Sequence, residues 1–239
     1  MLNREKHQLI MGRILRDIYA EPLLAPALGL KGGTAAYFFY GLPRFSVDLD
    51  FDALERDEAT HTVIQQRAES IGARYGAIKD SRIKRQTIFL LVSYGDTDHN
   101  IKIEISTRVL LPEIRKQYEL REHLGISMLV ATQPYLFASK LAALTLRSET
   151  AMRDIYDVWY FASNNWDIET DALKAMTGKG VAEQLADCIA LIELVKEREV
   201  LHGIGELLSE KDKTWVKQHL LSDAAFLLKN YQAVFKVKM

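Results

Sequence analysis

The hydrophobic pattern of this chain changes period near residue 132, and this change constrains the fold more than any single motif does. Before it, segments rich in β-branched and aromatic residues are separated by polar or glycine-containing turns, which predicts strands. After it, apolar residues recur at helical spacing almost to the end of the chain. We therefore expect an α+β fold, with a mixed or antiparallel sheet in a first domain, 1–132, and a helical second domain, 133–239.

The same pattern places the individual elements. Strands are predicted at 28–31, 47–51, 74–78, 86–94, 100–107 and 126–132. Helices are predicted at 1–20, 35–40, 55–72, 133–147, 151–163, 168–178, 180–202 and 212–235. Pro22 and Pro26 end the first helix because proline interrupts helical continuity.

Composition limits the class of protein. The chain has 239 residues, of which 48% are hydrophobic and 26% charged, so a disordered or fibrous protein is excluded. The single Cys188 rules out an internal disulfide framework, and no apolar run reaches the roughly 18 residues that a membrane helix needs. We therefore expect a soluble cytoplasmic protein with no membrane partner. The net charge of -1 lacks the basic excess of a general nucleic-acid binder.

Two aspartates one residue apart are the strongest chemical signal in the sequence. In Val47-Asp48-Leu49-Asp50-Phe51 the period of two places Asp48 and Asp50 on one face of a strand and the apolar residues on the other. Mg²⁺ prefers oxygen ligands and is usually held by one or two carboxylates together with substrate phosphates. Asp48 and Asp50 are therefore candidate catalytic and Mg²⁺-binding residues, although a solvated strand face is the alternative.

A glycine turn precedes this strand. Gly32, Gly33 and Thr34 begin a predicted helix, whose free N–H groups and dipole favour an anion such as a triphosphate. A turn with a purely structural role would look the same, but its spacing from the aspartates favours the nucleotide-binding interpretation. The flanking residues Lys31 and Ser46 join the candidate nucleotide-binding set.

A third carboxylate is available in the segment Asn100 to Ser106. Its isoleucines alternate with Lys102, Glu104 and Ser106, so one face is apolar and the other polar. If this strand lies beside the strand of Asp48, Glu104 joins the metal site. The alternative is a surface glutamate paired with Lys102 or with a neighbouring strand.

Two helical segments of the second half carry further candidates. Lys140 is the single lysine of an apolar helical segment, so its charge needs a route to solvent or an anionic partner such as a nucleotide phosphate. Asp154 and Asp157 are three residues apart on a helix with bulky apolar neighbours, which favours a site at the edge of the core. Arg153 and Asp157 also form an i,i+4 pair that could act only as helix stabilisation.

These motifs together resemble the AbiEii-type nucleotidyltransferases, toxin components of bacterial toxin–antitoxin systems in the DNA polymerase β-like superfamily. The matching segments are KGGTAAYFFYGLPRFSVDLDF, KIEIS, YLFASKLAAL and RDIYDVWYF, which span residues 31 to about 161. The resemblance implies a nucleotidyltransferase-type mixed sheet flanked by helices, with a helical second domain that completes the active site. A glutamate, Glu104, stands where the wider superfamily often has aspartate.

The resemblance also assigns roles to individual residues. Gly33 and Thr34 would contact phosphates, and Asp48 and Asp50 would bind Mg²⁺. Lys140 and Arg153 would contact the nucleotide. Asp154 or Asp157 would complete the site.

The implied reaction transfers a nucleoside monophosphate from an NTP to an acceptor hydroxyl. The family suggests RNA, in particular the 3′ end of tRNA, as acceptor and a cognate antitoxin as partner. The short basic segments 82–85 and 115–116, with Arg121, could contact phosphates or simply be solvated surface. A protein or small-molecule acceptor, and an inactive NTP-binding protein that acts through a partner, stay open as alternatives.

Overall fold

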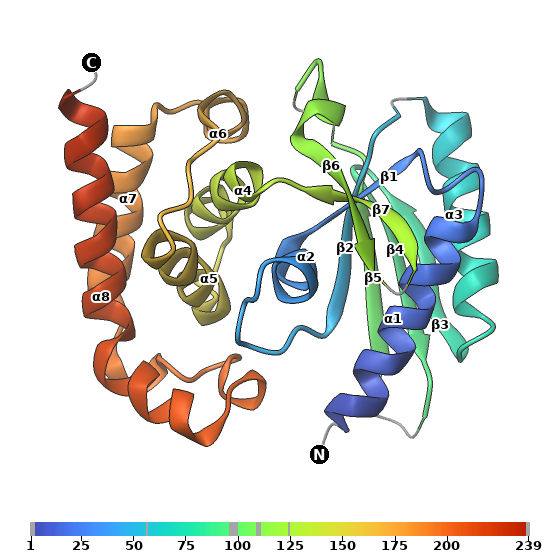
Figure 1. Ribbon diagram of the computed structural model, residues 1–239, viewed down its shortest axis with the longest axis horizontal. Coiled ribbons are helices and arrows are strands. Elements are labelled where there is room, and N and C mark those ends of the chain that lie inside the picture. Colours follow the sequence, from blue (N-terminus) through green and yellow to red (C-terminus); the bar gives the residue numbers. More distant parts are fainter. Residues whose placement is uncertain (1–2, 56, 96–99, 109–110, 124, 238–239) are drawn as a thin grey trace. The chain divides into compact units, whose positions relative to one another are not determined.

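The chain divides into two compact units in the computed structural model (Figure 1). The structure describes residues 3–55, 57–95, 100–108, 111–123 and 125–237. One unit contains Met1–Gly41 and Ser46–Thr132, and the other contains Leu42–Phe45 and Gln133–Met239. The predicted boundary at 132 stays a prediction about folding domains. The hydrophobic pattern did not predict that residues 42–45 belong to the second unit.

Within the described residues, seven strands of the first unit form one mixed sheet in the order β3-β4-β5-β2-β1-β7-β6. The strands are β1 (Leu28–Lys31), β2 (Asp48–Ala53), β3 (Ala77–Lys84), β4 (Thr87–Ser93), β5 (Asn100–Ser106), β6 (Tyr118–His123) and β7 (Ile126–Ala131). The pairs β2–β5 and β1–β7 are parallel, and the other neighbours are antiparallel. A mixed sheet is therefore confirmed.

Three helices flank this sheet: α1 (Arg4–Ala20), α2 (Gly32–Phe39) and α3 (Glu58–Gly72). Figure 1 shows α1 and α3 on one face and α2 on the other. The central strands bury their isoleucine, leucine and phenylalanine side chains completely, at Leu30, Leu49, Phe51, Ile103 and Ile105. Because strand side chains alternate between faces, this burial turns the acidic side chains of β2 and β5 to the other face.

The second unit contains helices and no strand among its described residues. Its helices are α4 (Gln133–Leu146), α5 (Met152–Ser163), α6 (Thr170–Thr177), α7 (Val181–Leu194) and α8 (Glu210–Val237), with short 3₁₀ turns η2 (Glu197–Glu199) and η3 (Gly205–Leu207). The long helix α8 packs on α5 and α7, while α4 packs on α5, α6 and α7. Phe161 stacks on Trp166 with ring centroids 4.0 Å apart, which anchors the end of α5 in this core.

The sequence missed or misplaced elements that lie mainly at the edges of the sheet. The strand predicted at 74–78 is found at 77–84, and β6 was not predicted. Both are edge strands with mostly exposed side chains, so neither shows apolar alternation. The helix predicted at 180–202 ends at Leu194, because Val195 has an extended backbone although the charged residues after it keep a helical pattern.

No helix in the described ranges combines the length and apolar character that would be needed to cross a bilayer.

Candidate active site

Strands β2 and β5 together present an acidic face. Their parallel register places Asp48 opposite Lys102 and Asp50 opposite Glu104. Leu49, between the two aspartates, is fully buried, whereas Asp48 and Asp50 are partly exposed, as the alternation predicted. We call Asp48, Asp50, Lys102 and Glu104 the acidic face. The structure thus brings the three predicted carboxylate residues onto neighbouring strands.

Lys102 lies among these carboxylates and pairs with two of them. Its Nζ is 3.2 Å from Asp48 Oδ2 and 3.3 Å from Glu104 Oε2. Burial alone would lower the pKa of Lys102, but the neighbouring carboxylates, led by Asp48, raise it above its usual value. Among the described residues, no three His, Cys, Asp or Glu side chains converge as a ready-made metal site. The pairing with Lys102 is the alternative that the sequence left open for Glu104.

The glycine turn packs directly against the acidic face. Gly32 begins α2 with a φ of +73°, and a Cβ at this position would lie 2.6 Å from Asp50 Oδ2. Only glycine combines this left-handed backbone with so close an approach. The start of the helix and the Asp50 carboxylate are therefore adjacent, as the spacing in the sequence indicated.

The hydroxyl groups of this region are buried and join the helix to the strand. Thr34 Oγ1 donates a hydrogen bond to the backbone carbonyl of Asp48 and shares another, 2.8 Å long, with Ser46 Oγ. Both residues are at most 6% exposed. In this structure the two side chains fix the position of Asp48 relative to α2.

A further aspartate follows on β2 and holds Lys31. Asp52 accepts hydrogen bonds from Lys31 Nζ at 2.5 Å and from the Tyr118 hydroxyl at 2.6 Å, and it is only 4% exposed. The ring of Tyr118 lies over Gly29, where a Cβ would come within 2.3 Å of it. Sequence reasoning missed Asp52 although Asp48, Asp50 and Asp52 continue one alternation.

The helical unit holds a buried ion cluster. Arg44 donates through Nε and Nη2 to both carboxylate oxygens of Asp157, at 2.5 and 2.7 Å. Lys140 Nζ lies 2.6 Å from Asp154 Oδ1 and 2.8 Å from Asp157 Oδ2. Arg147 Nε is 3.0 Å from Asp154 Oδ2. The two aspartate side chains are completely buried and those of Arg44 and Lys140 nearly so, whereas Arg147 reaches Asp154 from a side chain that is 45% exposed. We call these five residues the ion cluster.

The charges of this ion cluster stabilise one another against desolvation. Burial alone would raise the pKa of Asp154, but Lys140 and Arg147 lower it below its usual value. Burial alone would lower the pKa of Lys140, but Asp154 and Asp157 raise it. Asp154 and Lys140 are therefore both ionised at neutral pH, and the anionic partners of Lys140 are two carboxylates.

The structure thus gathers the predicted residues into two groups, one in each unit. Lys31, Gly32, Gly33, Thr34, Ser46, Asp48, Asp50 and Glu104 lie in the sheet unit, and Lys140, Arg153, Asp154 and Asp157 lie in the helical unit. Sequence reasoning did not assign Arg44 or Arg147 a role, because nothing in their neighbourhood indicates that they face buried acids. It treated Lys102 only as an alternative partner of Glu104.

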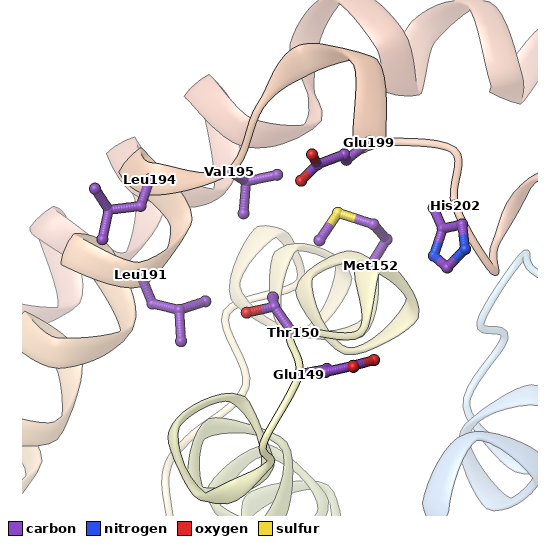
Figure 2. Close-up of a pocket in the computed structure, with 8 residues that line it drawn as sticks. All are labelled: Glu149, Thr150, Met152, Leu191, Leu194, Val195, Glu199 and His202. Carbon is purple, nitrogen blue, oxygen red and sulfur yellow. The ribbon is translucent and has the colours of Figure 1, made fainter.

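A pocket of the helical unit lies between the start of α5 and the end of α7 (Figure 2). Leu191, Leu194 and Val195 line one side, and Met152 faces Glu199 and His202 in the close-up. A neighbouring hollow shares Met152 and His202 and adds Ser148, Arg147 and Arg153. Of the residues predicted from the sequence, only Arg153 borders either hollow.

Comparisons with known proteins agree with this architecture. The model of the family described as nucleotidyl transferase AbiEii toxin, type IV toxin–antitoxin system, matches residues 13–215. A search of curated proteins found no match.

Solved structures share the fold. A proposed nucleotidyltransferase from Helicobacter pylori has a TM-score of 0.60 at 20% identity, with 98% of each chain covered. JHP933, also from Helicobacter pylori, has a TM-score of 0.56 at 19% identity, covering 100% of this chain and 99% of its own. MenT4, a nucleotidyltransferase toxin from Mycobacterium tuberculosis, has a TM-score of 0.61 at 18% identity, covering 96% and 87%.

At these identities the solved structures show the fold alone. The family match, by contrast, extends over most of the chain and includes every candidate site residue. The chain therefore belongs to the AbiEii family of nucleotidyltransferase toxins of type IV toxin–antitoxin systems, and it is a nucleotidyltransferase.

Proposed function

We propose that this enzyme transfers a nucleoside monophosphate from an NTP to an acceptor hydroxyl with the help of Mg²⁺. The observation that carries the proposal is the contact between Gly32 and the Asp50 carboxylate, which joins an anion-binding helix start to a cation-binding strand. A nucleoside triphosphate bound to a divalent cation needs both kinds of group side by side. Transfer of the nucleoside monophosphate releases pyrophosphate.

The acidic face fits a divalent cation. Asp48 and Asp50 supply hard carboxylate oxygens, and the ammonium of Lys102 beside Asp48 shows that this face accommodates positive charge. Asp48 and Asp50 would hold the ion, and Glu104 lies beside them on the neighbouring strand, paired with Lys102. When bound, Mg²⁺ neutralises phosphate charge and orients the triphosphate.

The residues around the helix start would hold the phosphates. The N–H groups of the first turn of α2 lack partners within the helix and attract anions. Lys31, fixed by Asp52, adds a positive charge at the end of β1. In the helical unit, Lys140, whose ammonium is held by Asp154 and Asp157, would contact the nucleotide, as the family resemblance implies. Arg153 has the same proposed role.

We propose RNA, in particular the 3′ end of tRNA, as the acceptor, and a cognate antitoxin as the partner that restrains the enzyme. Family membership supports the antitoxin, since AbiEii proteins are toxins of type IV toxin–antitoxin systems. The hollow that Arg147, Arg153 and Glu149 line in the helical unit is the surface that we propose for contact with RNA phosphates, since it carries two guanidinium groups.

A transfer assay with labelled nucleotide tests the proposal. The protein is incubated with each α-³²P-labelled NTP, Mg²⁺ and either total RNA or a cell lysate. Asp48→Asn is compared with Asp57→Asn, which makes the same substitution at an exposed helix cap that asparagine also satisfies. We expect label in RNA with wild type and Asp57→Asn, and none with Asp48→Asn or with EDTA.

Each other outcome contradicts a defined part of the proposal. Label in a protein would show that the acceptor is a protein and not RNA. Label in a small molecule would show that the acceptor is a small molecule. Binding of NTP with no transfer to any acceptor would contradict the catalytic role. Transfer by a folded Asp48→Asn protein at the wild-type rate would contradict the role of the acidic face.

A further inference from the structure

Lys102 has no role in the proposed chemistry, yet it occupies the centre of the acidic face. It is the residue directly opposite Asp48 in the parallel register, and its ammonium lies between Asp48 and Glu104 at nearly equal distances of 3.2 and 3.3 Å. Its side chain is 28% exposed, so solvent screens these contacts only partly. The ammonium therefore reduces the repulsion among the carboxylates.

We propose that Lys102 is a built-in counter-cation that competes with the divalent metal for Asp48 and moves to Glu104 when the metal binds. The inference rests on the proposed function, because it concerns the same metal site. Glu104 is then the residue that receives Lys102 and has no need to bind the metal itself. Lys102 is a positioning residue, since it acts through the two carboxylates.

The geometry makes the competition unavoidable. A metal bound by Asp48 would lie within a few ångströms of an ammonium that is 3.2 Å from the same carboxylate, and like charges at that range repel. Lysine can relieve this repulsion, because its four-carbon stem moves a point charge with little change in backbone. Glu104 Oε2 already pairs with Lys102, so the ammonium can leave Asp48 and keep an anionic partner.

The arrangement has a consequence for regulation of the site. Without nucleotide, only the protein carboxylates would hold the metal, and Lys102 would have to leave Asp48. The affinity of the site for the metal is therefore lowered. With nucleotide, the phosphates add ligands and offset the displacement. Lys102 therefore makes firm metal binding depend on the NTP, which keeps a bare divalent ion from occupying the site.

Metal affinity without nucleotide tests the inference. Mn²⁺ binding to the whole chain is measured by electron paramagnetic resonance, and by the Mg²⁺-dependent rise in melting temperature, for wild type, Lys102→Gln and Lys102→Arg. A nearby charge shifts an ionic equilibrium by about one to three powers of ten. We expect Lys102→Gln to bind Mn²⁺ at least about tenfold more tightly and Lys102→Arg to stay within about threefold of wild type. Lys116→Gln, at an exposed surface pair, is the matched control.

A double-mutant cycle separates the two roles of Glu104. If Glu104 acts only by receiving Lys102, Glu104→Gln weakens Mn²⁺ binding in wild type but has no effect in the Lys102→Gln background. If Glu104 binds the metal, the substitution weakens binding in both backgrounds, and that result would overturn its proposed role.

The two proposals fail in different ways. An unchanged Mn²⁺ affinity in Lys102→Gln, with binding still lost in Asp48→Asn, contradicts the counter-cation inference alone. Absence of any Mn²⁺ binding to wild type and Lys102→Gln, with or without NTP, contradicts the metal-dependent chemistry as well.

Discussion

The acidic face and the ion cluster contain similar residues but differ in charge balance and in exposure to solvent. The acidic face has three carboxylates for one ammonium, and its side chains keep access to solvent. The ion cluster has two carboxylates for three cations, and its aspartates are fully buried. An exposed excess of negative charge is suited to bind a metal ion. The stability of the buried carboxylates, by contrast, depends on each of their cationic partners.

This difference separates the effects of substitution. Removing a carboxylate charge from the acidic face lowers the repulsion there and leaves the fold intact, because water solvates the remaining groups. Removing a charge from the ion cluster leaves a desolvated ion without its partner, which lowers the free energy of unfolding strongly. The first region should therefore respond mainly in metal binding and transfer, and the second mainly in stability.

The largest expected effect on stability comes from Asp157. Asp157→Asn keeps the size of the side chain but leaves Arg44 and Lys140 buried without one of their anions. We expect the free energy of unfolding to fall by about 3–5 kcal/mol, measured by urea denaturation. Asp48→Asn should change it by less than about 1 kcal/mol.

A double substitution provides the control for Asp157. Arg44→Met combined with Asp157→Leu replaces the ion pair by apolar side chains of similar size, which often restores stability. The double variant should therefore be more stable than Asp157→Asn. If Asp157→Asn costs no more than Asp48→Asn, the two regions do not differ as described.

The next effect concerns acid pH. Asp154 has a lowered pKa in the folded protein because Lys140 and Arg147 outweigh its burial, and its usual value is 3.8. A lowered folded pKa gives stability that is fully present above the unfolded value and is lost as the pH falls through the folded value. We expect stability from this carboxylate to decline below about pH 3.8.

Acid titration of variants checks this window. Urea unfolding of wild type and Asp154→Asn is monitored by fluorescence at a series of pH values from 7 to 2. The variant should be less stable at neutral pH, and the two stabilities should approach each other in acid. A constant difference across the range would show that the Asp154 charge does not contribute.

How far the sequence could anticipate these regions depends on the physical signal each one leaves. Asp48 and Asp50 stand in a strand whose neighbours Leu49 and Phe51 are fully buried, so alternation alone placed them on one face. Buried central strands leave this pattern and were predicted. The edge strand β6, with side chains largely in solvent, leaves none and was missed.

Pairing across long separations leaves no signal in a single sequence. Arg44 and Asp157 are 113 residues apart and meet only because residues 42–45 belong to the helical unit. Asp52 was missed for a different reason, since its partner Tyr118 lies on the edge strand that the pattern did not show. The chemistry was therefore predictable from local motifs, whereas the partners that fix those motifs were not.

A smaller effect tests how tightly the helix start and the acidic face are joined. Gly32→Ala places a methyl group 2.6 Å from Asp50 Oδ2 at a φ of +73°. Gly178→Ala is the matched control, because its φ is +74° and a Cβ there meets nothing within 4 Å. Each substitution should cost about 1–2 kcal/mol for the left-handed backbone.

Only Gly32→Ala should also impair function, because it displaces the Asp50 carboxylate. We expect Mn²⁺ binding and labelled-nucleotide transfer to fall by about tenfold or more in Gly32→Ala, and to stay at the wild-type level in Gly178→Ala. Equal activity in the two variants would show that the contact with Asp50 is not needed.

The last effect, on stability alone, separates Asp52 from the two acids before it on the same strand. Tyr118→Phe removes the hydroxyl that donates to the buried Asp52, and a lost hydrogen bond to a charged group costs about 1.5–3 kcal/mol at most. Because Lys31 still neutralises Asp52, we expect the lower part of that range in urea denaturation. Tyr75→Phe removes a similar bond to the part-buried Asp17 and should cost less, because Arg16 and Arg74 still neutralise that carboxylate. If Tyr118→Phe instead leaves stability unchanged and alters Mn²⁺ binding, Asp52 belongs with the acidic face, and β2 carries three functional carboxylates in place of two.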